Sequence, residues 1–370
     1  MSTTPLAAPR RATITDVARE AGTGKTSISR YLNGEMSVLS PALRARIEAA
    51  IERLDYQPNQ MARGLKRGRN RLIGMLLADL TNPYTVEVLQ GVEAACQALG
   101  LMPLICHAAN EVEMERRYLQ LLTTYRVEGV IVNALGVHEE TLRPVGEGGI
   151  PAVLVDRSVD GLVTDMVGLD NRAAAELGTR HLLESGFDDI WFVVQPFEQV
   201  SSRQLREAAF REVMSGQGGE GHDGGTSGKG EGGKRGARGH TLVLNLAEPA
   251  AVERALAELD RAIDAAGAPD AATRKVTRLA LFAANAPVAL RLALHLKARY
   301  GADWQARVAL LSIDDPEWAE LTGITTIRQP TYEIGYRAVE FLHERIDGVQ
   351  TTARDCLLPG ELIVRASTSR

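Results

Sequence analysis

A chain of 370 residues with 45% apolar residues can bury more than one hydrophobic core, so two or three domains are expected. Its formal charge of −5 is unevenly distributed: residues 1–71 hold 13 Lys and Arg against 6 Asp and Glu, a local charge of +7 that leaves −12 for the rest. The basic N-terminal segment predicts a polyanionic partner that binds there and not on the acidic remainder.

Composition also argues against several classes of protein. The three cysteines, Cys96, Cys106 and Cys356, are too few and too scattered for a disulfide framework or a zinc site, so buried reduced thiols are expected. No stretch approaches about 18 uninterrupted apolar residues, and the first residues lack an apolar leader. We therefore expect a cytoplasmic protein with no membrane contact, no metal and no cofactor.

Residues 12–58 are predicted to form a small all-helical head. The first of three helices is expected to begin at Thr15 as its N-cap and to stop at Gly22. The third follows Ser40 and repeats apolar residues along one face up to residue 55. Between them lies AGTGKTSISRYLNG, residues 21–34, which permits two interpretations.

One interpretation is the phosphate-binding loop of an ATPase, because Gly24-Lys25-Thr26 resembles the end of such a loop. That loop needs a glycine at the position that Arg19 occupies, and it must follow an apolar strand. An amphipathic helix is expected there instead, so this interpretation fails.

The other interpretation is a DNA-reading helix over residues 27–33. Its polar face is built from short or cationic side chains at helical spacing: Thr26, Ser29, Arg30 and Asn33. Short polar side chains suit a helix inserted into the major groove, and a helix-turn-helix places its second helix there. A solvated polar face on an ordinary helical bundle remains the alternative, which the local positive charge disfavours.

From residue 72 onward, short apolar runs alternate with helices expected at residues 84–99, 113–125, 172–185 and 249–266. This alternation predicts parallel sheets covered on both faces, with too many strands for one sheet. Residues 215–240 are rich in glycine and lack an apolar anchor, so they are expected to form a disordered surface loop. His222 and His240 are expected to be solvated there.

The sequence resembles the LacI family of bacterial transcription regulators. The matching stretches are TITDVAREAGTGKTSISRYLNG, QMARGLKRGRNRLIGML, DLTNPYTVEVLQGVE and TTIRQPTYEIGYRAVEFL. The resemblance implies a helix-turn-helix head over residues 12–58, a hinge helix over 59–71 and a core over 72–370 that binds an effector and dimerises. The core would be an α/β structure of two doubly wound parallel-sheet lobes, as in periplasmic binding proteins. Lobe 1 would take residues 72–168 and 329–357, and lobe 2 residues 169–328 and 358–370.

The DNA contacts that we expect come from the head and the hinge. In the head they are Thr15, Lys25, Thr26, Ser27, Ser29, Arg30 and Asn33. In the hinge they are Asn59, Ala62, Arg63, Leu65 and Lys66. Family members insert a leucine, at the position of Leu65, into the minor groove at the centre of the operator, where an apolar side chain can unstack a base step. Packing of Leu65 against the same residue of a dimer partner is the alternative.

The resemblance also implies an effector cleft at the strand ends of the two lobes. Its expected residues are Tyr84, Asn133, Asp156, Arg157, Arg206, Asn285, Asp314 and Gln329. Aspartate and asparagine suit sugar hydroxyls, and arginine suits a carboxylate. Each residue could instead cap a helix or form an ion pair. Ala286 stands where the family usually has aspartate, so that part of lobe 2 is expected to differ.

KTSISRYLNG and QMARGLKRGRNRLIGML look most like the branch of the family that responds to sugar acids of the 2-ketogluconate or gluconate type. The expected function is a dimeric repressor of sugar-acid catabolic genes that effector binding releases from double-stranded operator DNA. Corepression by the ligand, or a neutral sugar as ligand, are the nearest alternatives. A sugar-binding receptor would not explain the basic head, and no catalytic motif of an enzyme occurs in a suitable strand context.

Overall fold

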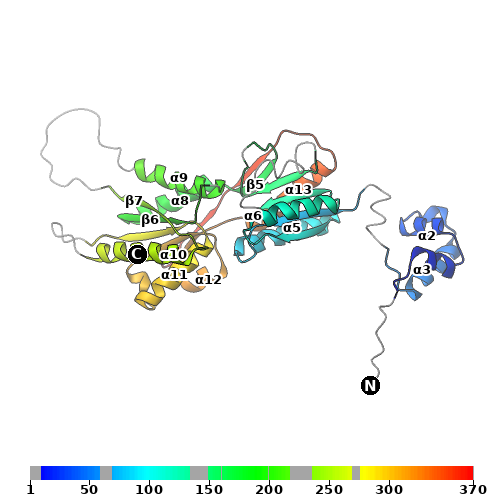
Figure 1. Cartoon of the computed structure of the whole chain (residues 1–370), viewed down its shortest axis with the longest axis horizontal. Coiled ribbons are helices and arrows are strands. Elements are labelled where there is room, and N and C mark those ends of the chain that lie inside the picture. Colours follow the sequence, from blue (N-terminus) through cyan, green and yellow to red (C-terminus); the bar gives the residue numbers. More distant parts are fainter. Residues whose placement is uncertain are drawn as a thin grey trace, which may run out of the picture. The chain divides into compact units, whose positions relative to one another are not determined.

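The computed structural model describes residues 10–58, 69–133, 149–159, 161–198, 200–216, 236–268 and 276–369. It divides into two compact units, Met1–Asn70 and Arg71–Arg370 (Figure 1). The first unit contains the helical head, and the second contains two parallel-sheet lobes, which confirms the predicted fold class.

The head contains α1 (Ile14–Glu20), α2 (Lys25–Leu32), the short 3-10 helix η1 (Met36–Val38) and α3 (Pro41–Arg53). One small core holds the three α-helices together, with Val17, Ile28 and Ile47 fully buried. Thr15 is not the N-cap of α1. That position belongs to Thr13, whose side-chain oxygen accepts the N–H of Asp16 while the Asp16 carboxylate accepts the N–H of Thr13. A capping box therefore starts α1 two residues earlier than expected.

Lobe 1 is built on a six-stranded sheet in the order β11-β5-β4-β3-β1-β2, with every pair parallel. The strands are β1 (Leu72–Leu77), β2 (Met102–His107), β3 (Gly129–Asn133), β4 (Ala152–Val155), β5 (Asp165–Leu169) and β11 (Asp355–Leu358). Helices α5 (Pro83–Leu99) and α13 (Thr331–Ile346) cover one face, and α6 (Val112–Thr124) covers the other. Figure 1 labels α5, α6 and α13 in the same lobe as β5.

Lobe 2 has a sheet in the order β12-β10-β9-β8-β6-β7, in which β12 alone is antiparallel to its neighbour. Its strands are β6 (Asp189–Val194), β7 (Arg238–Val243), β8 (Leu279–Ala283), β9 (Ala309–Ile313), β10 (Thr325–Arg328) and β12 (Glu361–Ile363). Its helices are α8 (Asn171–Glu184), α9 (Ser201–Gly216), α10 (Pro249–Gly267), α11 (Ala286–Tyr300), η2 (Trp304–Ala306) and α12 (Glu317–Thr322). Helices α8 and α9 cover one face, whereas α10 and α11 cover the other.

Three expectations need correction. The glycine-rich loop is shorter than residues 215–240, because α9 continues to Gly216 and β7 begins at Arg238. His240 is therefore a strand residue, stacked on Trp191 with ring centroids 4.6 Å apart, whereas His222 and residues 217–235 lie outside the described part. The three cysteines are free thiols, but only Cys96 is buried, since β2 and β11 lie at sheet edges. The strands β10, β11 and β12 were not predicted, because each has only three or four residues and includes polar or charged ones, so none is an apolar run.

The chain passes between the two sheets three times, after β5, after β10 and after β11, and these crossovers touch one another. The N–H of Asp170 donates to the Leu358 carbonyl at 2.8 Å. A Cβ added at Gly360 would lie 2.7 Å from Ile327 Cγ2, so the second and third crossovers approach closely there.

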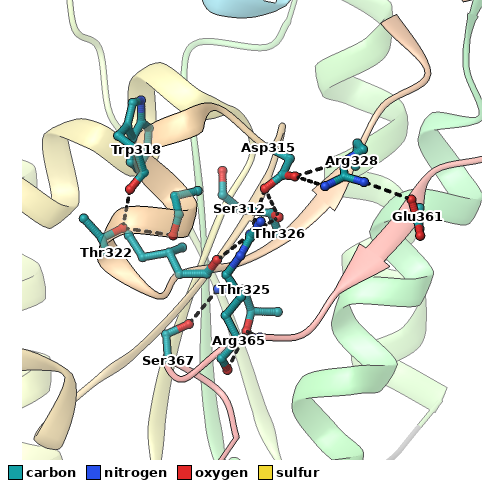
Figure 2. Close-up of polar contacts among 12 residues, drawn as sticks. Ser312, Asp315, Trp318, Thr322, Thr325, Thr326, Arg328, Glu361, Arg365 and Ser367 are labelled. Carbon is teal, nitrogen blue, oxygen red and sulfur yellow. Dashed lines mark hydrogen bonds and ion pairs between the residues drawn. The ribbon is translucent and has the colours of Figure 1, made fainter.

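A buried carboxylate secures the second crossover (Figure 2). Asp315 Oδ1 accepts a hydrogen bond from Thr326 Oγ1 at 2.7 Å and lies 2.7 Å from Arg365 Nη1. Asp315 Oδ2 accepts a hydrogen bond from Arg328 Nη2 at 2.7 Å. The C-terminal segment contributes further, since Ser367 Oγ accepts the N–H of Thr325 at 2.9 Å. These contacts hold β10 and the C-terminal segment next to Asp315, which follows β9.

Helices α5 and α13 pack closely because glycines lie at their contact. A Cβ added at Gly335 would collide with the carbonyl oxygen of Val88, and one added at Gly91 with that of Tyr332. Neither neighbour can move without shifting a helix backbone. The two glycines thus allow the close approach of α5, which follows β1, and α13, which follows the second crossover.

We expect Gly335→Ala to lower the free energy of unfolding by at least about 2 kcal/mol, because the two helices must separate to admit the methyl group. Urea denaturation followed by circular dichroism measures this. Gly267→Ala is the control, since its added Cβ meets no atom within 4 Å, and it should leave the midpoint unchanged or slightly raised. Equal midpoints for both variants would show that the helix contact is not close.

Candidate DNA-binding face and effector cleft

The exposed side of α2 carries the residues expected to contact DNA. Lys25, Thr26 and Arg30 are exposed, Ser27, Ser29 and Asn33 are half-buried, and Ile28 is fully buried in the head core. The helix starts at Lys25, after the extended N-cap Gly24, so Lys25 and Thr26 lie in its first turn. Unbonded N–H groups and the positive end of the helix dipole point there, which favours a phosphate. Thr15 is exposed on α1.

An acidic residue that sequence reasoning missed lies beside this face. Glu35 Oε1 accepts a hydrogen bond from Asn33 Nδ2 at 3.4 Å, and Arg30 Nε lies 4.0 Å from Glu35 Oε2. Both are long contacts at an exposed site, so they are weak and can exchange for contacts with bases. The turn after α2 brings Glu35 back towards the helix, which helical spacing alone does not predict. Asn59, Ala62, Arg63, Leu65 and Lys66 lie outside the described residues.

The residues expected to bind an effector surround the ends of strands from both lobes. Asn133 ends β3, Asp156 follows β4, Asn285 follows β8 and Asp314 follows β9. Asp156 and Asp314 adopt positive φ angles of 67° and 78°, an uncommon conformation for a residue with a side chain. Such strain is concentrated at functional sites.

Arg206, on α9, is 4% exposed and connects these strand ends. Its Nε donates to Asn171 Oδ1 at 2.6 Å and its Nη1 donates to the Ala284 carbonyl at 2.6 Å. Its Nη2 lies 3.9 Å from Asp156 Oδ1, an oxygen that accepts no hydrogen bond among the described residues. Asp156 Oδ1 is therefore left as an acceptor for a ligand hydroxyl.

Asp314 and Gln329 form a second polar pair. Asp314 Oδ1 accepts from Gln329 Nε2 at 2.5 Å, and Oδ2 accepts the N–H of Ala286 at 2.8 Å. Burial raises the pKa of Asp314, although Arg206, the Ala286 N–H and Gln329 oppose the shift. Ala286 thus binds Asp314 through its backbone N–H.

Asn285 and Asn133 are partly used by the fold. Asn285 Oδ1 caps α11 by accepting the N–H of Val288, and its Nδ2 donates to Gln195 Oε1 at 2.8 Å. Asn133 Nδ2 donates to the Val155 carbonyl at 3.2 Å. Each is therefore held in one orientation, with part of its hydrogen-bonding capacity left.

Tyr84 lies in the first turn of α5 and packs in the lobe 1 core, so its ring is not available for stacking in this state. Its hydroxyl has no hydrogen-bond partner among the described residues. Tyr84, Glu87, Asp314 and Gln329 line a cavity of about 20 Å³, which holds about one water molecule. A sugar would have to displace side chains or separate the lobes to enter from this side.

Arg157 adjoins the same cluster. Burial lowers its pKa, while Asp156 and Tyr84 favour its charged form. Two further side chains, Arg203 and Gln195, contact one another, and Gln195 also contacts Asn285; neither was among the expected residues. Arg203 lies one helical turn before Arg206 on α9, a spacing visible in SSRQLREAAF, so the signal was present.

The described part of the chain has no group of three or more metal-ligating side chains and no helix long and apolar enough to cross a membrane. Three family models match the sequence. Residues 13–59 match "Bacterial regulatory proteins, lacI family" and residues 70–223 match "Periplasmic binding proteins and sugar binding domain of LacI family". Residues 179–368 match "Periplasmic binding protein-like domain".

Among characterised relatives, the HTH-type transcriptional regulator PtxS of Pseudomonas plecoglossicida is 40% identical, with 100% of this chain and 99% of the relative covered. The HTH-type transcriptional regulator KdgR of Bacillus subtilis (strain 168) is 31% identical over 96% of this chain and 97% of the relative. The lac repressor dimer bound to operator and an anti-inducer is similar in fold, with a TM-score of 0.76 and 20% identity, covering 97% and 99% of the chains.

We expect Arg30→Ala to weaken binding to a duplex selected from a randomised library by about 10- to 100-fold, since a bidentate base contact contributes about 1–3 kcal/mol. Fluorescence anisotropy at fixed salt measures this. Arg46→Ala removes the same charge from an exposed position of α3 and should have the smaller effect. A larger loss for Arg46→Ala would place the reading face elsewhere.

Asp314→Asn should weaken effector binding yet leave the unfolding temperature at pH 7 equal to or above that of the wild type. The raised pKa means that the ionised carboxyl is disfavoured in the folded state, so Asp314 reduces stability above its unfolded pKa of about 3.9. The amide can accept from Ala286 and donate to Gln329 Oε1, which has no partner among the described residues. Thermal unfolding with and without ligand tests this.

Asp315→Asn is the matched control with the opposite sign. Burial acts to raise the pKa of Asp315, but hydrogen bonds from Arg365, Thr326 and Arg328 outweigh it and lower the pKa. This carboxylate therefore stabilises the fold above its unfolded pKa, and that contribution is lost as the pH falls through the lower folded value. Its amide variant should melt below the wild type at pH 7. Identical shifts for both variants would contradict the assignment.

Proposed function

Because the chain belongs to the LacI family of DNA-binding transcriptional regulators, we propose that it is a repressor that a sugar acid releases from its operator. The observation that supports this ligand class most directly is the buried Arg206, which lies among Asp156, Asn171 and the strand ends of both lobes. A neutral sugar needs hydroxyl-binding groups alone, whereas a carboxylate needs a cationic partner.

The similarity to PtxS and KdgR over nearly the whole chain supports the same ligand class, given the resemblance of the head and connector to sugar-acid-responsive regulators. In this proposal the sugar hydroxyls contact the aspartates and asparagines at the strand ends, and Gln329 senses the ligand from the second crossover. Tyr84 would contact the ligand through its buried hydroxyl.

DNA contact is proposed for the exposed face of α2, for Thr15 and for the hinge residues from Asn59 to Lys66, with Leu65 in the minor groove. The proposed division of the chain is residues 12–58 for the head, 59–71 for the hinge and 72–370 for the two-lobed core. Since the operator lies on the bacterial chromosome, the proposed location is the cytoplasm.

A homodimer is part of the proposal, because a near-palindromic operator pairs with a two-fold symmetric protein. Exposed leucines on two helices of lobe 2 support it. Leu290 and Leu294 lie one turn apart on α11, and Leu321 on α12 is 87% exposed. Both helices bury their other sides in the same hydrophobic cluster, and exposed apolar residues of this kind mark protein contacts.

The proposed switch acts through the three crossovers. A ligand bound between the strand ends changes the orientation of the two lobes about the crossovers. Lobe 1 transmits this change to the hinge that precedes β1. The Asp315 network holds the second crossover on the lobe 2 side, while α13 continues from it into lobe 1. Ligand and operator therefore bind to different arrangements of one element.

Linkage provides the test. A thermal-shift screen of sugar acids, including 2-ketogluconate and gluconate, and of neutral sugars first identifies the ligand. Calorimetry then measures its affinity with and without a saturating operator duplex, and anisotropy measures operator affinity with and without ligand. We expect both affinities to fall by the same factor, about 5- to 150-fold, because coupling is reciprocal.

Three outcomes would contradict the proposal. Stabilisation by neutral sugars alone would reject the sugar acid, and unchanged affinity in the presence of operator would reject an allosteric ligand. A ligand that tightens operator binding would replace release with corepression.

A further inference from the structure

Arg203 is a cationic side chain in the cleft whose hydrogen bonds go to neutral acceptors. Its Nη1 donates to the Pro196 carbonyl at 2.7 Å, and its Nη2 donates to Gln195 Oε1 at 3.1 Å. Among the described residues, no carboxylate lies within ion-pairing distance of it. The side chain is half-buried, so water screens its charge incompletely.

Two other arginines add to this charge. Arg206, one turn further along α9, directs its Nε and Nη1 to Asn171 and to the Ala284 carbonyl, which are also neutral. Arg157 approaches from the end of β4 in lobe 1. Burial, followed by repulsion from Arg157 and Arg206, lowers the pKa of Arg203 to about 10. Repulsion from both arginines thus adds to the cost of burying the Arg203 charge.

The acidic residues nearby compensate for this only in part. Asp156 lies 3.9 Å from Arg206 and is the one carboxylate that favours the charged form of Arg203. Asp314 is already bound by the Ala286 N–H and Gln329. Glu115 acts on Arg157 rather than on Arg203. Arg203 therefore shares Asp156 with Arg206 and has no carboxylate of its own among the described residues, which is costly for a partly buried charge until an anion arrives.

The orientation of Arg203 is set by a short chain of contacts. Gln195 Oε1 accepts both from Arg203 Nη2 and from Asn285 Nδ2 at 2.8 Å, and Asn285 is held in turn as the N-cap of α11. The guanidinium is therefore held in place by neutral groups without being neutralised, the arrangement expected of a preorganised anion-binding group.

We propose that Arg203 binds the carboxylate of the effector, beside Arg206 and Arg157, and that it is the residue that discriminates sugar acids from neutral sugars. This rests on the proposed function, because it names the group that recognises the acid. The strand-end aspartates and asparagines then bind the hydroxyls that acids and neutral sugars share. Discrimination and general sugar binding are thereby assigned to different side chains.

Calorimetry with two matched probes, D-gluconate and its neutral amide D-gluconamide, tests this on the full-length protein. If the thermal-shift screen favours 2-ketogluconate, that acid and its amide replace them. The variants are Arg203→Gln and Arg203→Lys. Arg172→Gln is the control, since it removes an exposed arginine of α8 that pairs with Glu212 on α9.

We expect Arg203→Gln to weaken binding of the acid by about 10- to 100-fold, the value of a charge-assisted hydrogen bond, and binding of the amide by less than about threefold. Arg203→Lys should fall between, because it keeps the charge but loses the bidentate geometry. The acid affinity of Arg203→Gln should also depend less on salt than that of the wild type. Arg172→Gln should match the wild type.

Equal losses for acid and amide, or no loss for either, would overturn the role of Arg203 while leaving the repressor proposal intact. Wild-type protein that binds the amide as tightly as the acid would overturn both the role of Arg203 and the sugar-acid effector. If Arg203→Gln melts well below the wild type, the stably folded Arg203→Lys variant decides. The proposal is rejected if that variant discriminates acid from amide as the wild type does and shows the same salt dependence.

Discussion

The buried guanidinium of Arg206 is the interaction on which the cleft depends. It reaches the start of α8 through Asn171, the end of β8 through the Ala284 carbonyl and the end of β4 through Asp156, so one side chain contacts both lobes. Such a contact is possible only because the chain crosses between the sheets at points that touch one another, which brings strand ends from both sheets together. Loss of Arg206 would remove the donor to Asn171 Oδ1 and to the Ala284 carbonyl, and each buried group left unsatisfied costs about 1–3 kcal/mol.

The charged side chains near the crossovers form two sets. Asp315, Arg328 and Arg365 form a satisfied network under the second crossover, where every group has an opposite charge or a hydrogen bond. In the second set, Asp156, Arg203 and Arg206 are buried or half-buried, but their charges are incompletely paired. The first arrangement stabilises the fold at neutral pH, whereas in the second burial disfavours the charged form of Arg203. This division is consistent with a protein whose effector contributes free energy to a conformational change.

Much of the molecule follows from sequence patterns. The helical head, the alternating strands and helices and the positions of α5, α6, α8 and α10 are visible as periodicity, because each element buries one face. Errors arose where local signals compete or are short. Thr13 and Thr15 are both plausible caps, and the choice depends on Asp16 reaching back to Thr13. His240 looked like part of a glycine-rich loop, but pairing with β6 extends the strand to Arg238.

The cleft shows the same boundary between sequence and structure. The sequence itself determined three features: the residue types at strand ends, the spacing of Arg203 and Arg206 on one helix, and the polar face of α2. Each follows from the repeat of a helix or a strand. Which of these groups are already satisfied was decided only by the tertiary structure. Three contacts illustrate this: the Ala286 N–H binds Asp314, Glu35 approaches Arg30, and Arg203 donates to neutral acceptors. Each joins residues that are distant in sequence or separated by a turn. Electrostatic balance is a property of neighbours in space, and a linear pattern does not contain it.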